Sequence, residues 1–258
     1  ITVNKVYSVQ NYADYTGALI DIETKDYPLR PFISVKAGGG INTNSTFNEF
    51  VQLENNGISY LGLNTKKRRE AVPESSKTYN QSQSYTEEIF NTGFSPDRYN
   101  ALPNFDFAIS GGKLFSLKKK QLGLLISTTF NNDYIFEPDA LNSILKRDGT
   151  NQKYYVRESY QYITSFSNLL TLSYKSSAYN SLSYNLIYLV SGLDEYDEAK
   201  GRNYDGEILH YNSGFFESHQ LLNNQLSGKH KLTEKTSLKW AAGYAMAKSD
   251  VPDVRIIA

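Results

Sequence analysis

The sequence has no cysteine and only one methionine in 258 residues. Without cysteine there is no disulfide framework, no thiolate metal site and no cysteine nucleophile. Net charge is also lacking, because 27 basic residues balance 27 acidic ones, so no bulk attraction to nucleic acid or to an anionic membrane surface is encoded. No apolar run approaches the ~18 residues that a membrane-spanning helix needs. Residues 1–10 lack the basic start and apolar core of a signal peptide.

Aromatic residues, in contrast, are abundant. The chain has 21 tyrosines and 13 phenylalanines although its mean hydropathy is -0.50. Two environments accommodate so many amphipathic rings in a polar chain: a soluble all-β protein, or a transmembrane β-barrel whose rings lie at the lipid headgroups. Helical periodicity is scarce, so the pattern along the extended segments must decide between the two.

Stretches in which apolar and polar side chains alternate recur after Pro31, as expected of tilted barrel strands. In the clearest stretch, the even positions from Tyr160 to Tyr174 are mainly apolar and the odd positions from Gln161 to Lys175 mainly polar. The expected strands cover 32–42, 104–117, 122–136, 160–175, 181–190, 215–232 and 237–248. We therefore predict an all-β fold, an antiparallel transmembrane β-barrel of which this chain carries about seven strands.

Short and long connections alternate along this chain of expected strands. Tight turns are expected at 118–120, 176–181 and 233–236, and long loops at 43–103, between 136 and 160, and between 190 and 215. Outer-membrane barrels place short turns on the periplasmic side and long loops outside. Such barrels use an even number of strands and cannot leave backbone groups unpaired in hydrocarbon, so we expect the chain to be incomplete. Residues 250–258 enter what we interpret as another long loop, without a final strand that ends in an aromatic residue.

The first part of the sequence carries a recognisable pattern. A Lys-x-Tyr segment at 5–7 leads through the acidic-aromatic-x-Gly turn at 14–17 into the Ile-Glu-Thr-Lys-Asp-Tyr-Pro run at 22–28, and a Gly-rich, Asn/Thr-rich strand follows at 37–47. This arrangement resembles the end of the plug domain and the first barrel strand of TonB-dependent outer-membrane receptors, most closely those of Bacteroidetes. The match covers about the first 50 residues. It departs from the pattern at Ala18, where a second glycine is usual.

The resemblance implies a division of the chain and a function. Residues 1–28 would be the C-terminal end of the plug, and residues 29–258 the N-terminal part of the barrel with long extracellular loops. The TonB box and most of the plug would precede Ile1. The implied function is import of a scarce nutrient, such as a ferric siderophore, vitamin, glycan or peptide, across the outer membrane of a Gram-negative bacterium. The implied partners are the TonB complex, outer-membrane lipids and the nutrient, with no nucleic acid.

Two other classes of protein stay open at this point. One is an outer-membrane barrel of another class, either secretion-associated or enzymatic. The other is a soluble all-β binding protein such as a lectin. Import needs no covalent chemistry, so we predict no enzyme activity, no catalytic residue, no cofactor and no metal site.

Several groups of residues could form sites, but each is better explained by a simpler role. The three histidines, His210, His219 and His230, lack metal-ligand spacing, so we expect them to be ordinary polar residues. The run Asp194–Glu198 lacks an EF-hand pattern, so we expect it to be a solvated loop tip. The basic run Lys66–Arg69 could recognise phosphates, but a solvated loop is the default. Gly38–Gly40 lacks the residues of a phosphate-binding loop and predicts bending or close packing instead. The tyrosines of strands 160–175 and 181–190 share their parity with leucines and are expected to face lipid.

Overall fold

The computed structural model describes most of the chain beyond the first thirty residues. The described residues are 2–4, 19–21, 28, 30–53, 58–63, 95–118, 120–202 and 204–257. None of them forms a helix with the length and apolar character that a membrane crossing requires. The Lys66–Arg69 run and most of the predicted plug segment 1–28 lie outside these residues.

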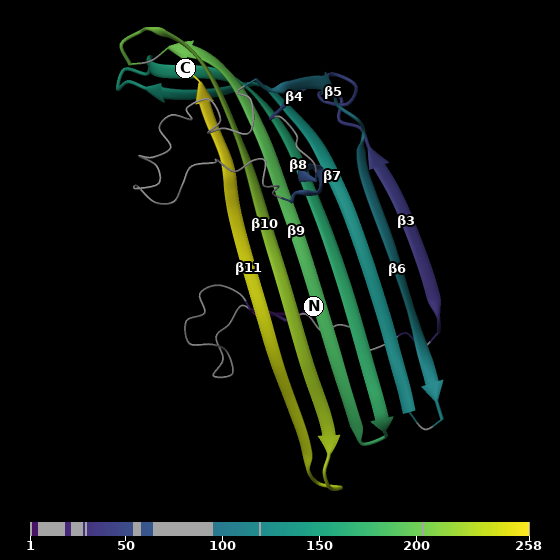
Figure 1. Ribbon diagram of the computed structural model, residues 1–258. Helices are drawn as coiled ribbons and strands as arrows, with labels where there is room; N and C mark the ends of the chain where they lie inside the picture. The colour runs from purple at the N-terminus through teal and green to yellow at the C-terminus, as the bar shows by residue number, and fades with distance from the viewer. Residues whose placement is uncertain are drawn as a thin grey trace, which may run out of the picture.

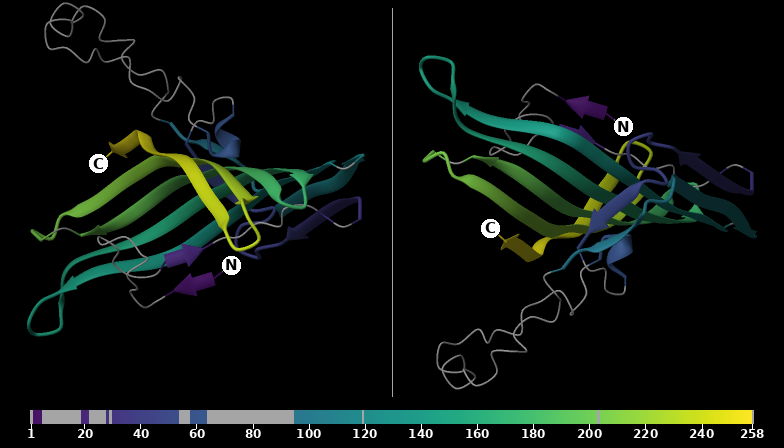
Figure 2. Two further views of the ribbon diagram at one scale, coloured as in Figure 1. Left: turned by 90° about the horizontal axis from the view of Figure 1, so that it is seen from below. Right: turned by 90° about the horizontal axis from the view of Figure 1, so that it is seen from above.

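One antiparallel sheet of seven strands dominates the molecule, in the order β11-β10-β9-β8-β7-β6-β3 (Figure 1). Its strands are β3 (Phe32–Gly40), β6 (Asn104–Leu117), β7 (Lys120–Leu145), β8 (Asn151–Ser177), β9 (Asn180–Arg202), β10 (Ile208–Lys231) and β11 (Ser237–Ile257). Every predicted strand is present, and neighbours in sequence pair with each other. The all-β, antiparallel part of the prediction is therefore confirmed. The sheet is curved (Figure 2) but open, because β3 and β11 each pair with one strand only.

The predicted tight turns join strands at one end of the sheet, which we call the turn end. Positions 118–119 connect β6 to β7, and 178–179 connect β8 to β9. The connection from β10 to β11 is closed by a hydrogen bond from the Leu232 N–H to the Thr236 carbonyl, 2.9 Å. Lys118 adopts a left-handed conformation with φ 58, which a turn this short demands.

Three of the four predicted long loops are not loops. Residues 250–257, which were expected to enter a loop, belong to β11. The positions between 136 and 160 and between 190 and 215 belong mostly to the strands, which run for 26 residues in β7, 27 in β8, 23 in β9 and 24 in β10. Only 146–150 and 203–207 connect them at the other end of the sheet, the loop end. The loop prediction was wrong because the backbone ladder continues after the apolar alternation fades.

Two small sheets and one 3-10 turn lie outside the large sheet. β1 (Thr2–Asn4) pairs with β2 (Leu19–Asp21), and β4 (Glu49–Gln52) pairs with β5 (Asp97–Asn100), each as a separate two-stranded sheet. The 3-10 turn η1 (Ser59–Leu61) follows β4. The elements β4, β5 and η1 come from the predicted loop 43–103 and pack on one side of the large sheet near the loop end, against β8 and β9 (Figure 2).

Register divides the large sheet into two unlike faces, because side chains alternate along each strand and partners share a side. Across β7 to β11, one row reads Leu124, Leu172, Tyr184, Leu226 and Ala242. The adjacent row, on the other face, reads Gly123, Ser173, Ser183, Ser227 and Ala241. We call the first side the apolar face and the second the polar face.

Candidate functional site

The apolar face carries large exposed side chains from the middle of the sheet to the turn end. Ile33 is 83% exposed and Ile126 is 51% exposed, values far above those of core residues. This apolar belt comprises Ile33, Val35, Ile109, Phe115, Ile126, Leu172, Leu182, Leu226, Leu238, Tyr244 and Met246. All seven strands contribute to it, so the patch is continuous, whereas soluble proteins expose such side chains singly. Lys113 lies on the same face, and its ammonium sits over the Phe115 ring, 5.0 Å from its centre.

The polar face at the same level is linked by hydrogen bonds between small hydroxyl and amide side chains. Thr171 donates to the Asn185 side-chain carbonyl at 2.9 Å, and the hydroxyls of Ser173 and Ser183 lie 3.3 Å apart. The Thr129 and Ser167 hydroxyls are hydrogen-bonded nearer the loop end of the sheet. Cross-strand hydroxyl pairs of this kind stabilise a sheet whose face meets a polar environment. The apolar face of the sheet thus suits an apolar surrounding, and the polar face suits a hydrated one.

Near the loop end, the apolar face is covered by part of the chain itself. We define the docked segment as residues 42–53, 58–63 and 95–101. Its side chain Phe50 is fully buried and meets the rings of Tyr134 and Tyr160 edge-on, at centroid distances of 5.2 and 5.6 Å. Tyr162, 7% exposed, donates to the Tyr60 carbonyl at 3.3 Å. The prediction that the tyrosines of this strand face lipid is therefore wrong for Tyr160 and Tyr162, because the docked segment covers them.

The tyrosines nearer the turn end have different surroundings. Tyr174, Tyr184 and Tyr188 lie on the same face as Tyr160, at partly exposed positions. Tyr184 donates to Asn224 at 2.7 Å, and Tyr188 donates to Gln220 at 3.3 Å. These phenol groups satisfy their polar atoms within the sheet while their rings add to the apolar face.

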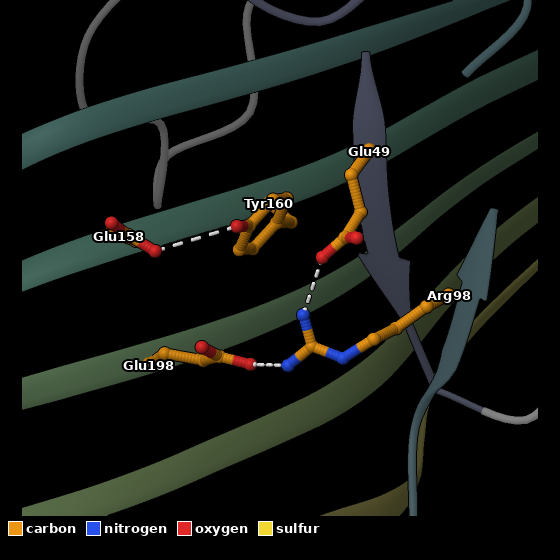
Figure 3. Close-up of polar contacts among 5 residues, drawn as sticks. All are labelled: Glu49, Arg98, Glu158, Tyr160 and Glu198. Atoms are coloured by element: carbon orange, nitrogen blue, oxygen red, sulfur yellow. Dashed lines mark hydrogen bonds and ion pairs between the residues drawn. The ribbon is translucent and has the colours of Figure 1, made fainter. Parts of the chain in front are cut away.

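A charged contact fixes the docked segment to the sheet (Figure 3). Glu158 and Glu198 are register partners on the apolar face, an arrangement that is unfavourable for two like charges. The Arg98 guanidinium pairs with Glu198 and, at 2.7 Å, with Glu49. Hydrogen bonding to Glu49 raises the pKa of Arg98 above its ordinary value. Burial opposes this shift, and the charge of Glu198 adds to it. Tyr160 donates to Glu158 at 3.4 Å, so the second carboxylate is also engaged.

Backbone carbonyls of the docked segment and of the sheet accept two further buried hydrogen bonds. The Ser45 hydroxyl donates to the Tyr134 carbonyl at 2.7 Å, and the Ser218 hydroxyl donates to the Gly62 carbonyl at 2.6 Å. Burial raises the pKa of the Tyr99 phenol, which therefore stays protonated and donates to Gln52. Packing, charge and hydrogen bonding together hold the segment in one place. Sequence reasoning missed this feature because its contacts join positions that are far apart in the chain.

The acidic run Asp194–Glu198 is not the solvated loop tip that was predicted. It lies inside β9, with Asp194 3% and Asp197 6% exposed. Alternation sends Glu195 and Asp197 to the polar face, where Arg157 pairs with Asp197 at 3.1 Å and approaches Glu195 at 4.0 Å. The run was mistaken for a loop because charges occupy both of its faces, which hides the strand periodicity.

No cluster of three or more metal-ligating side chains occurs among the residues that the structure describes. His219 contacts Glu217 at 2.7 Å, His230 bonds to Asn180 and Trp240, and His210 is exposed on β10. The structure does not bring the three histidines together. Gly38 lies close to β6, because a Cβ there would lie 2.3 Å from an Asp106 carboxylate oxygen, and the Asp106 side chain would have to move to admit it.

Comparison of the chain with protein-family models, with curated proteins and with solved structures found no match.

Proposed function

We propose that the chain is part of an outer-membrane β-barrel transporter of the TonB-dependent type. Residues 29–258 form a portion of the barrel wall, and residues 1–28 form the end of the plug. The apolar belt faces lipid, and the polar face lines the hydrated lumen. The barrel imports a scarce nutrient with energy supplied through the TonB complex.

The observation that carries the membrane placement is the exposure of the apolar belt across all seven strands, opposite a face of hydroxyl and amide groups. Burying the belt against hydrocarbon removes its contact with water, worth roughly 25 cal/mol per Å² of apolar surface. A barrel wall has this two-faced composition. The open edges at β3 and β11 are those that further strands would pair. The transport and coupling roles rest on the resemblance over about the first 50 residues.

Site-directed labelling tests the membrane placement, and these 258 residues contain no cysteine that would compete for the label. Neighbouring positions Leu226 and Gln225 are both exposed and lie on opposite faces. Spin labels at Leu226→Cys and Gln225→Cys are compared in the full-length protein reconstituted in lipid vesicles. We expect the label at 226 to collide with oxygen dissolved in the bilayer, and the label at 225 to collide with a water-soluble nickel complex. Equal access of the nickel complex to both labels would refute the membrane placement and favour a soluble sheet.

A second measurement tests the energy coupling separately. The purified periplasmic domain of TonB is passed over the full-length receptor held in detergent. Capture supports the proposed class of transporter. A receptor that passes the labelling test but does not capture the domain belongs to another class of outer-membrane barrel.

A further inference from the structure

The turn end of the polar face holds a concentration of lysines around a hollow. The hollow has a volume of about 720 Å³ and lies between the 178–179 and 232–236 turns. Lysines and one glutamate line it: Lys175, Lys229, Lys231, Lys235, Lys239 and Glu234. We call it the lysine pocket. Its volume falls within the range of about 300–1,000 Å³ that is typical of small-ligand sites.

Register forces the lysines together. Lys229 and Lys239 are direct partners on adjacent strands, and Ser181, the other neighbour of Lys229, is in turn the partner of Lys175. Side chains of direct partners lie on the same face with Cβ atoms about 5 Å apart, and like charges in that position destabilise the sheet. In the part of the chain that the structure describes, none of the five lysines has a carboxylate within ion-pair distance.

The surroundings of the lysines supply hydrogen-bond donors and an apolar wall. Ser173, Ser181 and Ser227 lie on the polar face of the hollow, and Tyr179 borders it. The Lys231 ammonium sits over the Tyr179 ring, 5.5 Å from its centre, which holds one cation at the rim. Ammonium groups with hydroxyl donors beside them match the charge and the acceptor oxygens of a phosphate group.

We propose that the lysine pocket binds a phosphate group. The anion lies between the ammonium groups of Lys229 and Lys239 and removes the repulsion that their register imposes. A soluble phosphate ester that reaches the lumen and the headgroup of a phospholipid at the rim present the same chemistry, and the two sources are separated by experiment. The lumen and the lipid rim as sources rest on the proposed function, whereas the lysine pocket itself does not depend on it.

Trp240 gives a readout, because it follows Lys239 directly in β11 and is the single tryptophan of the sequence. Its fluorescence is followed while pyrophosphate is added to the full chain in neutral detergent, with sodium chloride of equal ionic strength as the reference. The test variant is Lys229→Gln with Lys235→Gln and Lys239→Gln. The matched variant is Lys118→Gln with Lys120→Gln and Lys146→Gln, which removes the same charge outside the pocket. Strand content by circular dichroism establishes that both variants are folded.

We expect saturable binding in the unmodified chain and in the matched variant, with a dissociation constant raised about tenfold or more in the pocket variant, since three exposed charge contacts are lost. That result supports a soluble phosphate ligand. A response that appears only when phosphatidylglycerol is added to the micelles, and that is weakened in the pocket variant alone, supports a lipid headgroup. Equal weakening in both variants, a response reproduced by sodium chloride, or no response to either phosphate source would overturn the proposal.

Discussion

Gly62 of the docked segment and Gly192 of β9 meet so closely that a Cβ on Gly192 would lie 2.3 Å from the Cα of Gly62. Gly62 itself has φ 76, a conformation that glycine adopts without strain. The docked segment therefore reaches the sheet through direct backbone contact at this point.

Substitution at this contact should release the docked segment. Gly192→Ala places a methyl group against backbone atoms of the docked segment, so we expect a cost of roughly 1–3 kcal/mol, as for other overpacked sites. Limited proteolysis within 43–103 should become faster. Gly243→Ala is the control, because its nearest contact is an ordinary 3.5 Å to the Asn224 carbonyl. Equal protease resistance in both variants would contradict the close packing.

Phe50 is expected to be the main apolar anchor of the docked segment. Removing a fully buried phenyl ring in Phe50→Ala leaves a cavity among Tyr134, Tyr160 and Tyr99, and such changes cost about 3–5 kcal/mol. Phe47, which is 67% exposed, provides a control at which Phe47→Ala should change stability little. Tyrosine fluorescence and protease resistance in denaturant report the difference. A loss of similar size at both positions would argue against the anchor.

The apolar belt should tolerate charge less well than the polar face does. In lipid vesicles, Leu226→Arg places a guanidinium among lipid chains in the proposed barrel, which costs about 2–4 kcal/mol near the bilayer midplane. Gln225→Arg, one residue away on the polar face, should cost much less. Refolding titrations in urea measure both. Greater damage from the change at 225 would reverse the assignment of the faces.

The 146–150 turn should have an acid-sensitive hydrogen bond. The Thr150 hydroxyl and N–H donate to Asp148 at 2.6 and 2.9 Å and lower the pKa of its carboxyl. The pKa is lower in the folded state, so the carboxylate stabilises the turn above its unfolded pKa, and this contribution is lost as pH falls through the folded pKa. Carboxyl titration by NMR should yield a higher pKa in Thr150→Val, which keeps only the N–H donor. An unchanged pKa in that variant would exclude a role for the hydroxyl.

The location of a strand, and the face on which each of its side chains lies, could be predicted from the sequence where one face is apolar and the other polar. From Leu122 to Phe136 and from Tyr160 to Tyr174, one parity is mainly apolar and the other mainly polar, and both stretches are strands. In β9 beyond Val190 the difference disappears, since Glu198 on one face is held by Arg98 and Asp197 on the other by Arg157. Hydrogen bonding still extends the strand, but hydropathy no longer reports it.

The docked segment and the lysine pocket could not be predicted in the same way. Phe50 reaches Tyr134 and Tyr160 across more than 80 positions, and Lys229 meets Lys239 only because the turn at 232–236 sets that register. Such contacts depend on pairing between strands, which a pattern within one segment does not specify. The local signals, namely a run of glycines and a few charged turns, gave no indication of them.

The length of the strands affects how a ligand would be captured in the proposed barrel. A strand of 26 residues rises for about 90 Å, whereas a bilayer crossing uses only 9–11 residues or so. In the proposed barrel, most of the additional strand length extends beyond the lipid as a hydrogen-bonded sheet around the entrance. An arriving nutrient would then touch a surface already fixed in shape, and its capture would require little ordering of the receptor.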